Sequence, residues 1–386
     1  MRISTRLLAL GASAAIAFAA CGGGASPSPT GATPTDAPSG EPTAPPESAA
    51  TMDWKACVAF DTGGLGDKGF NDLAKKGLED AAAAGYETAF SEAQGATDYA
   101  ANIQRLIDEG CQTIVTVGFL QSQATADAAI ANPEVAFAQV DTAWNTAGPD
   151  FIPGNEDDTP IPPNFTGLDY QIDQAAMLAG YLAAGFSESG KIGTYGGQQF
   201  PGVTRFMDGM YAGIAYYNEQ KGTNVVLLGW DGDSTGTFVG GDNPWNDPAK
   251  GEQLAQALLD QGVDIVHPVA GATGNGSIKA MLDAGKWAIG VDTDQAISLA
   301  EYAGAILTSA QKAIDVSVLD VIAKNAGGNL GGEDYSGTLF NEGVLISPYH
   351  EFESVISAEL QAEVETLKDQ LSKGEISVCE YLARGC

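Results

Sequence analysis

Residues 55–71 read KACVAFDTGGLGDKGFN, and this stretch decides the fold class. The mostly apolar run Lys55–Asp61 predicts a buried β-strand, and a glycine-rich loop follows it. Over Asn71–Gly85 the apolar residues recur at helical spacing, which predicts an α-helix. A strand that passes through a short loop into a helix is the repeating unit of parallel sheets with helices on both faces.

The same alternation of strand and helix continues along the rest of the chain. Further strands are predicted at or near Gln112–Gly118, Glu134–Asp141, Lys191–Gly196, Asn224–Trp230, Val263–Ala270 and Trp287–Asp292. Longer helices are predicted near Gln171–Phe186, Gly202–Lys221 and Ala249–Gln261. The pattern falls into two runs of similar length, so we expect an α/β protein with two similar lobes.

Carboxylates and glycines stand at the ends of many predicted strands. They are Asp61, Gly118, Asp141, Gly196, Gly271 and Asp292. Open parallel sheets bind ligands beyond the carboxyl ends of their strands, and two lobes can face each other with these ends. A single Asp or Gly can end a strand for structural reasons alone, but their recurrence predicts a ligand site between the lobes.

Charge and missing motifs argue against several functional classes. Fifty Asp and Glu residues against 18 Lys and Arg residues give a formal net charge of −32, which repels nucleic acids. The GxGxxG sequence at Gly64–Gly69 lies close to Asp61 and contains Asp67, whose charges disfavour a dinucleotide pyrophosphate. HExxH does not occur in the sequence, and the GxSxG match at 232–236 is not followed directly by a predicted helix, as a nucleophile elbow would be. We therefore predict no catalysis, no cofactor and no metal site.

The first residues have the order of an export signal. A basic start and the apolar, small-residue run 7–20 precede Cys21. Residues 18–21, FAAC, resemble a bacterial lipobox, so we expect a signal peptide over 1–20 and a lipid on Cys21. Ordinary secretion with an incidental cysteine is the alternative. Residues 21–51 are rich in Pro, Thr and Gly and predict a disordered linker, which would tether the protein at the extracytoplasmic face of the cell membrane.

The four remaining cysteines predict disulfide bonds, which an exported protein can keep. Cys57 and Cys111 lie at the same end of two predicted strands and come within bridging reach if those strands are neighbours. Cys379 and Cys386 would close a short C-terminal loop. Free buried thiols are the alternative, and no cysteine spacing is typical of a metal site.

Residues 60–71, FDTGGLGDKGFN, also carry a family resemblance. They resemble the pattern D-x-G-G-x-x-D-K-S-F-N of the basic membrane protein family, which includes the purine nucleoside receptor A lipoproteins of nucleoside ABC transporters. Gly69 replaces the usual Ser, and the likeness covers most of residues 53–350. Further similar blocks lie at 117–119, 138–141, 177–184, 196–201, 206–209, 245–251, 290–295 and 307–312.

The resemblance implies a type I periplasmic-binding-protein fold, in which two doubly wound parallel-sheet lobes are joined by three hinge crossings. We place these crossings near Leu168, Ile297 and Tyr335. Lobe 1 would then comprise 52–167 and 297–334, and lobe 2 would comprise 168–296 and 335–386. No coiled-coil or other oligomerising segment is evident, so a monomer is expected.

The resemblance also implies which rings hold the ligand. In the purine receptors the base stacks between two aromatic side chains, and the corresponding residues here are Phe70 and Trp245. A Phe is usual in the family where Trp245 stands, but an indole offers a similar flat face. Gly271 would allow the backbone to approach the ligand closely. Simple core packing is the alternative for both rings.

Polar residues complete the site that the resemblance implies. Asp61 and Asn71 would hydrogen-bond the edge of the base, and Asp141 would lie beside the bound nucleoside. Asp292 would accept hydrogen bonds from ribose hydroxyls, and Lys312 would reach the sugar. A buried carboxylate is better tolerated beside this lysine than alone.

The sequence therefore predicts a lipid-anchored solute-binding protein that captures nucleosides, purine nucleosides above all, for an ABC permease. Alternatives with the same fold are a receptor for a sugar or another small polar solute, and a sensory lipoprotein that presents its ligand to a membrane partner. A nucleoside hydrolase would need a calcium-holding cluster of aspartates, for which Asp61 and Asp67 are too few. A repressor would need a helix-turn-helix, which residues 22–51 cannot supply.

Overall fold

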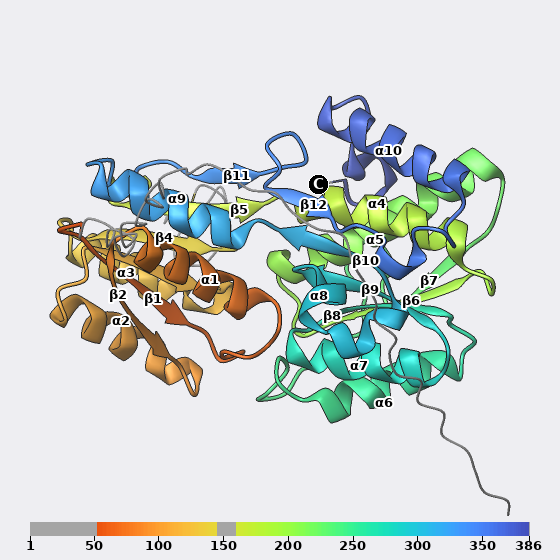
Figure 1. Ribbon diagram of the computed structural model, residues 1–386, viewed down its shortest axis with the longest axis horizontal. Helices are drawn as coiled ribbons and strands as arrows, with labels where there is room; N and C mark the ends of the chain where they lie inside the picture. The colour runs from red at the N-terminus through yellow and green to blue at the C-terminus, as the bar shows by residue number, and fades with distance from the viewer. Residues whose placement is uncertain (1–51, 145–159, 386) are drawn as a thin grey trace, which may run out of the picture. The chain divides into compact units, whose positions relative to one another are not determined.

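The computed structural model describes residues 52–144 and 160–385, which form two α/β lobes (Figure 1). Each lobe is built on one six-stranded sheet, with the order β11-β5-β4-β3-β1-β2 in lobe 1 and β12-β10-β9-β8-β6-β7 in lobe 2. All neighbouring strands in these sheets pair in parallel except β10 and β12. The predicted fold class is therefore confirmed. The predicted signal peptide, Cys21 and the linker lie outside the described residues.

Lobe 1 takes most of its elements from one continuous stretch. They are β1 (Lys55–Phe60), α1 (Phe70–Ala83), β2 (Glu87–Glu92), α2 (Tyr99–Asp108), β3 (Thr113–Val117), α3 (Ser122–Ala131), β4 (Ala136–Val140) and β5 (Phe165–Tyr170). Two later elements return to this lobe, α9 (Ile314–Ala326) and β11 (Tyr335–Gly337). Helices α1 and α9 cover one face of the sheet, and α2 and α3 cover the other (Figure 1).

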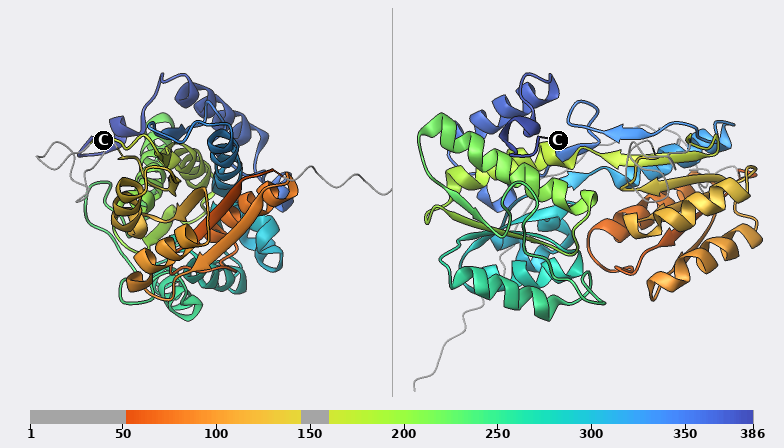
Figure 2. Two further views of the ribbon diagram at one scale, coloured as in Figure 1. Left: turned by 90° about the vertical axis from the view of Figure 1, so that its left-hand side faces the viewer. Right: turned by 180° about the vertical axis from the view of Figure 1, so that it is seen from behind.

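Lobe 2 contains the remaining strands and helices. They are α4 (Ile172–Phe186), β6 (Lys191–Gly196), α5 (Pro201–Lys221), β7 (Val226–Leu228), α6 (Pro248–Leu259), β8 (Ile265–Val269), α7 (Ala272–Asp283), β9 (Trp287–Asp292), α8 (Gln295–Ser298), β10 (Ile306–Lys312), β12 (Val344–Ile346) and α10 (Ala358–Ser372). Helices α4 and α5 cover one face of its sheet, with α10 packed on α4, while α6 and α7 cover the other face (Figure 2). Short 3-10 helices lie at Ala96–Asp98, Phe119–Gln121 (η2), Ala300–Ala305, His350–Phe352 and Val378–Tyr381.

Burial on both faces explains why the central strands are mostly apolar. Every residue of β3 and β4 is buried, as are the residues of β1 after Lys55. Helices cover both sides of these parallel strands, so side chains that point either way leave water. In lobe 1 the returning helix α9 packs closely on α1, because a Cβ on Gly77 would lie 2.7 Å from the carbonyl oxygen of Asp315.

The chain passes between the lobes three times. It crosses after Tyr170 at the end of β5, after Lys312 at the end of β10, and again between β11 and β12. The crossing segments hydrogen-bond to one another, because the N–H of Gln171 donates to the carbonyl of Gly337 at 2.8 Å. Three adjacent connections of this kind form a hinge at which two lobes can rotate.

Two of the expected crossing points fall inside a strand, and one is displaced. Leu168 belongs to β5 and Tyr335 to β11, both in the sheet of lobe 1, so each crossing lies a few residues later than expected. The crossing expected near Ile297 lies after Lys312 instead. Strand β10 pairs with β9, so residues 297–312 belong to lobe 2 rather than to lobe 1.

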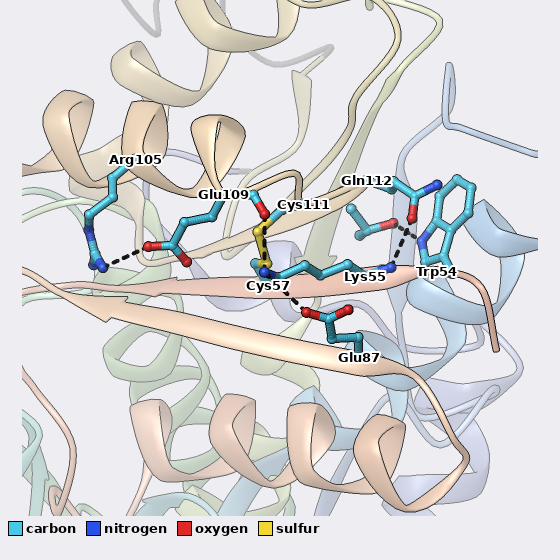
Figure 3. The surroundings of a disulfide bond; sticks show 9 residues. Trp54, Lys55, Cys57, Glu87, Arg105, Glu109, Cys111 and Gln112 are labelled. Atoms are coloured by element: carbon cyan, nitrogen blue, oxygen red, sulfur yellow. Dashed lines mark hydrogen bonds and ion pairs between the residues drawn. A yellow bond between two sulfur atoms is a disulfide. The ribbon is translucent and has the colours of Figure 1, made fainter. Parts of the chain in front are cut away.

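One disulfide bond joins two neighbouring strands of lobe 1. Cys57 in β1 is bonded to Cys111, which precedes β3, with 5.9 Å between their Cα atoms, as the sequence predicts (Figure 3). The pairing of β1 with β3 brings the two cysteines together. Cys379 is also disulfide-bonded, and its predicted partner Cys386 lies outside the described residues.

Candidate functional site

A pocket lies where the carboxyl ends of the two sheets face each other. It encloses about 610 Å3 of space between atoms, counting the part open to solvent. All eight residues that the sequence predicts as ligand contacts line it: Asp61, Phe70, Asn71, Asp141, Trp245, Gly271, Asp292 and Lys312. The other lining residues are Gly63, Asp67, Gly118, Phe119, Leu120, Phe200, Gly202, Val203, Phe206, Val269 and Ala270.

The loop between β1 and α1 forms a hydrogen-bonded group around Asn71. The side-chain Nδ2 of Asn71 donates to Asp61 Oδ1 at 3.0 Å and to Asp67 Oδ2 at 3.1 Å. The Asp67 carboxylate also accepts from the backbone N–H groups of Gly69 and Asn71, so it satisfies the otherwise unpaired start of α1. The Oδ1 atom of Asn71 is buried without a partner. It is therefore an acceptor that a ligand N–H group can satisfy.

Burial changes the proton affinity of the acids in this loop. Loss of solvation raises the pKa of Asp61 from 3.8 to about 6, although hydrogen bonds from Gly63 and Asn71 oppose the rise. Loss of solvation also raises the pKa of Asp67. A ligand that donates hydrogen bonds to the Asp61 carboxylate would stabilise its ionised form, so binding and protonation of this group oppose each other.

Lys312 lies between two carboxylates that come from different lobes. Its Nζ atom is 2.7 and 2.9 Å from the two oxygens of Asp141 in lobe 1, and 3.5 Å from Oδ1 of Asp292 in lobe 2. Burial raises the pKa of both carboxyls, that of Asp292 to about 6, although the charge of Lys312 opposes the rise. The lysine makes the burial of the two acids tolerable, because each charge keeps a partner.

Asp141 and Asp292 share a rare backbone conformation. Their φ angles are 65° and 64°, in the left-handed region that residues other than glycine seldom adopt. Asp141 directly follows β4, and Asp292 is the last residue of β9. Such a conformation costs on the order of 1–3 kcal/mol and is found mainly at functional sites, where the surrounding structure enforces it. Here it turns two equivalent strand ends toward the same lysine.

Aromatic rings come to the pocket from both lobes. Phe70 is the first residue of α1, and its ring centroid lies 5.3 Å from Nζ of Lys312. Trp245 comes from lobe 2, and a Cβ on Gly197 would lie 2.2 Å from its indole ring, so only glycine fits behind that ring. Gly271 has a φ of 54° and packs against the backbone of Trp245. A Cβ on Gly271 would lie 3.1 Å from the carbonyl oxygen of Trp245.

Comparison with known proteins shows the family to which this chain belongs. A family model described as "ABC transporter substrate-binding protein PnrA-like" matches residues 55–380. The chain belongs to this family, the Bmp family. It is thus an ABC transporter substrate-binding protein, and the resemblance noted at residues 60–71 is confirmed.

Relatives of this Bmp family protein match it over most of their length. Basic membrane protein A1 of Borrelia garinii subsp. bavariensis is 27% identical over 321 residues, which cover 82% of this chain and 86% of the relative. The ABC transporter nucleoside-binding protein BmpA of Lactococcus lactis subsp. cremoris is 26% identical over 351 residues, covering 84% and 89%. A crystal structure of an ABC transporter solute-binding protein from Aeropyrum pernix K1 gives a TM-score of 0.72 at 26% identity, covering 84% and 92%.

Several pocket residues of this Bmp family protein were not predicted from its sequence. Phe119, Phe200 and Phe206 line the pocket, and the ring centroid of Phe206 lies only 4.8 Å from Nζ of Lys312. All three lie inside the family-like sequence blocks 117–119, 196–201 and 206–209. Their place in these blocks was the sequence signal that could have identified them as pocket residues. Among the residues of 52–144 and 160–385, no group of three or more His, Cys, Asp or Glu could hold a metal ion.

Proposed function

We propose that this Bmp family protein captures nucleosides, purine nucleosides above all, and delivers them to an ABC permease. The observation that carries the proposal is the combination of two flat rings, Phe70 and Trp245, with two separate polar groups in one pocket. One polar group is Asp61 with Asn71, and the other is Lys312 with its two carboxylates. A nucleoside has the matching parts, namely a flat base with N–H groups and a sugar with hydroxyls.

The spacing of the two polar groups suits a ligand of nucleoside length. Asp61 follows β1 and Asp141 follows β4, and strand β3 lies between these two strands in the sheet. Strands stand about 4.8 Å apart, so the two strand ends are separated by roughly 10 Å. A base bound near Asp61 would therefore place its ribose near Lys312. Stacking of the base on an aromatic ring contributes about 1–3 kcal/mol.

Charge favours an unphosphorylated ligand. The pocket contains the carboxylates of Asp61, Asp67, Asp141 and Asp292 and the single cation Lys312. A phosphate group in this pocket would meet an excess of negative charge, and the one lysine is already paired with two acids. The printed name of the Lactococcus lactis relative, a nucleoside-binding protein, supports the same ligand class.

Isothermal titration of the purified protein tests the ligand. We expect inosine, guanosine and adenosine to bind with micromolar or tighter affinity, and ribose or free bases to bind much more weakly. Heat with sugars alone would instead favour a sugar receptor of the same fold. No heat with any nucleoside would overturn the proposal. A light-scattering measurement on the same sample checks the further proposal that the protein is a monomer.

We also propose that lipid on Cys21 anchors the protein at the extracytoplasmic face of the cell membrane. No helix within residues 52–144 and 160–385 is long and apolar enough to cross a bilayer. Metabolic labelling with a fatty acid tests the anchor, and Cys21→Ala should abolish the label and release the protein from the membrane fraction. A label that persists in Cys21→Ala, or a variant that stays in the membrane, would contradict the anchor.

The transport role is tested in cells. Deletion of the gene should reduce uptake of a labelled purine nucleoside, and the wild-type gene should restore it. Unchanged uptake in a strain without other nucleoside importers would contradict delivery to a permease. In that case a sensory role, with ligand presented to a membrane signalling partner, would become the better account.

A further inference from the structure

Two phenylalanine rings from different lobes stack on each other at the pocket. The ring of Phe119 in lobe 1 and that of Phe200 in lobe 2 have centroids 4.9 Å apart and planes inclined by only 10°. Both residues line the pocket and are partly buried. The Phe200 ring also lies 5.7 Å from the ring of Trp245. A row of three rings therefore runs from lobe 1 to the proposed stacking face.

The ring from lobe 1 is presented by a firmly held turn. Phe119 begins the 3-10 helix η2, and only Gly118 separates it from the end of β3. The side-chain Nε2 of Gln121 in the same turn donates to the carbonyl oxygens of Ala59 and Val117, both at 2.9 Å. These bonds fix the turn to the ends of β1 and β3, so the position of the Phe119 ring follows the position of the lobe 1 sheet.

The ring from lobe 2 is fixed at the start of a long helix. Phe200 precedes Pro201, the first residue of α5, and its carbonyl accepts from the N–H groups of Val203 and Thr204, both at 2.9 Å. Proline at this position has the φ angle that a helix start requires. The Phe200 ring therefore moves with α5 and with lobe 2 as a whole.

A second residue of lobe 1, Asp141, also contacts the start of α5. A Cβ on Gly202 would lie 2.9 Å from Oδ2 of Asp141, so the carboxylate packs directly against the helix backbone. A carboxylate is favourable at the N-terminus of a helix, where backbone N–H groups point outward. The first turn of α5 is therefore a surface on which lobe 1 docks through Phe119 and Asp141.

We propose that Phe119 and Phe200 form a closure latch for the pocket. The stack requires the two lobes to approach, so it stabilises the closed form and not an open one. The Phe200 ring of the stack also packs beside the Trp245 ring, with 5.7 Å between their centroids. The latch acts on the lifetime of the bound ligand and not on its first encounter, because the rings meet only after the ligand has entered. Both residues are positioning residues, and the ligand named in the test rests on the proposed function.

A double-mutant cycle on ligand release tests the latch. In stopped-flow experiments with inosine, Phe119→Ala and Phe200→Ala should each raise the dissociation rate about tenfold, with association rates changed less than about threefold. The double variant should release inosine no faster than the single variants, because either truncation already removes the stack. Phe340→Ala is the matched control, since Phe340 is 83% exposed and lies outside the pocket lining.

Two results would overturn the latch. One is a double variant whose release rate is the product of the two single effects, which would mean that each ring contacts the ligand independently. The other is unchanged release in both single variants. If the wild type binds no nucleoside, the proposed function fails, and small-angle scattering then decides the latch without ligand. A wild type more compact than the double variant keeps the latch, and equal radii of gyration overturn it.

Discussion

The two lobes share one strand order, but the corresponding joint, the contact between the first and third strands of the lobe, is stabilised differently in each. In both lobes the first strand lies between the second and third strands of that lobe, and it begins with a lysine, Lys55 or Lys191. The Nζ atom of Lys55 donates to the carbonyl of Glu109, and that of Lys191 donates to the carbonyl of Gln261. These matched contacts make the joint between β1 and β3 in lobe 1 the counterpart of the joint between β6 and β8 in lobe 2.

Close to these matched contacts, the two joints differ in the side chains that hold the strands together. Lobe 1 has the Cys57–Cys111 disulfide, and the residue that corresponds to Cys57 in lobe 2 is Gly193. The space of the missing side chain is filled by Leu258, whose Cδ1 atom would lie 2.8 Å from a Cβ on that glycine. One joint is thus closed covalently and the other by apolar packing. A repeated topology can therefore be stabilised by different interactions in each lobe.

At the pocket the two lobes are alike. Asp141 and Asp292 end corresponding strands, have nearly equal φ angles, and both face Lys312. They differ in distance, because the closest contact of Lys312 is 2.7 Å with Asp141 and 3.5 Å with Asp292. We infer that Asp141 mainly holds the lysine across the hinge, whereas Asp292 has more freedom to bind ligand.

Removal of the shared lysine should have the largest effect. Lys312→Met leaves two buried acids without a partner, so the free energy of unfolding at pH 7 should fall by about 3–5 kcal/mol, and nucleoside affinity should fall about a hundredfold or more. Denaturant unfolding and titration calorimetry measure these changes. The loss of stability should shrink at pH 5, because burial raises the pKa of Asp292 to about 6 and that group takes up a proton, while burial also raises the pKa of Asp141.

An exposed ion pair provides the control for that prediction. Lys324 and Asp320 form a pair on the surface of α9, with 2.8 Å between Nζ and Oδ2. Lys324→Met should change the free energy of unfolding by less than about 1 kcal/mol. Equal stability losses at pH 5 and pH 7 in Lys312→Met would contradict the role given to the two carboxylates.

Removal of the disulfide should be nearly as costly but confined to one lobe. The double variant Cys57→Ala with Cys111→Ala should lose about 3–4 kcal/mol of stability, because the bond closes a loop with a sequence separation of 54 residues. Hydrogen exchange should show faster exchange in β1 and β3 and little change in β6 and β8, which serve as the internal control. Equal loosening in both lobes would show that the joints are not independent.

Conservative changes of the two pocket acids should separate their roles. Asp292→Asn should weaken the binding of nucleosides about tenfold more than that of free bases, because the lost charge faces the ribose in the proposed complex. Asp141→Asn should lower the stability of the ligand-free protein more than Asp292→Asn does, because its contacts with Lys312 are shorter. Titration calorimetry and thermal unfolding of both variants test this. Equal losses for nucleosides and bases in Asp292→Asn would rule out its contact with the sugar.

Acid should act on stability and binding in opposite directions. The pKa values of Asp61 and Asp292 are raised to about 6, so the folded protein holds these protons more tightly than the unfolded chain does. Their contribution to stability is therefore fully present below about pH 4 and is lost as the pH rises through about 6. Binding needs the ionised forms, so affinity should fall about tenfold for each group between pH 7 and pH 5. Affinity that is constant over this range would contradict the proposed hydrogen bonds.

The smallest effect is expected where the sequence departs from the usual family pattern. Trp245→Phe keeps a flat ring against Gly197, so nucleoside affinity should change by less than about threefold. Trp245→Ala removes the ring and should cost about tenfold or more. A large loss in Trp245→Phe, measured by titration calorimetry, would show that the indole itself and not merely a flat face is required.

The parts of the fold that are visible in the sequence are those buried on both faces. Strands β1, β3 and β4 are short runs of mostly apolar residues, so they could be predicted. Strand β2 was missed because it lies at the edge of its sheet and reads ETAFSE, with little continuous apolar character. Strand β10 was missed because its last residues are polar and carry Lys312 into the pocket, and this omission displaced the second hinge crossing.

The candidate site could be predicted only where a residue matches a local motif. The eight expected contacts come from strand ends and family-like blocks, and the fold brings all of them to one pocket. The Phe119–Phe200 stack joins residues that are 81 positions apart in the sequence, and no local sequence pattern predicts such a contact. Asp141 and Asp292 could be predicted as strand-end acids of one site, but not as matched partners of one lysine, because that match is a property of two sheets and not of either strand alone.

A melting-temperature comparison of the purified protein is the most direct test of nucleoside capture. Purine nucleosides, pyrimidine nucleosides, free bases and sugars are each added at concentrations up to the millimolar range. A ligand that binds only the folded state adds about 2.7 kcal/mol of stability at a hundredfold excess over Kd. We expect a clear rise in melting temperature with inosine, guanosine or adenosine and none with ribose. A rise with sugars alone, or with no compound, would contradict nucleoside capture.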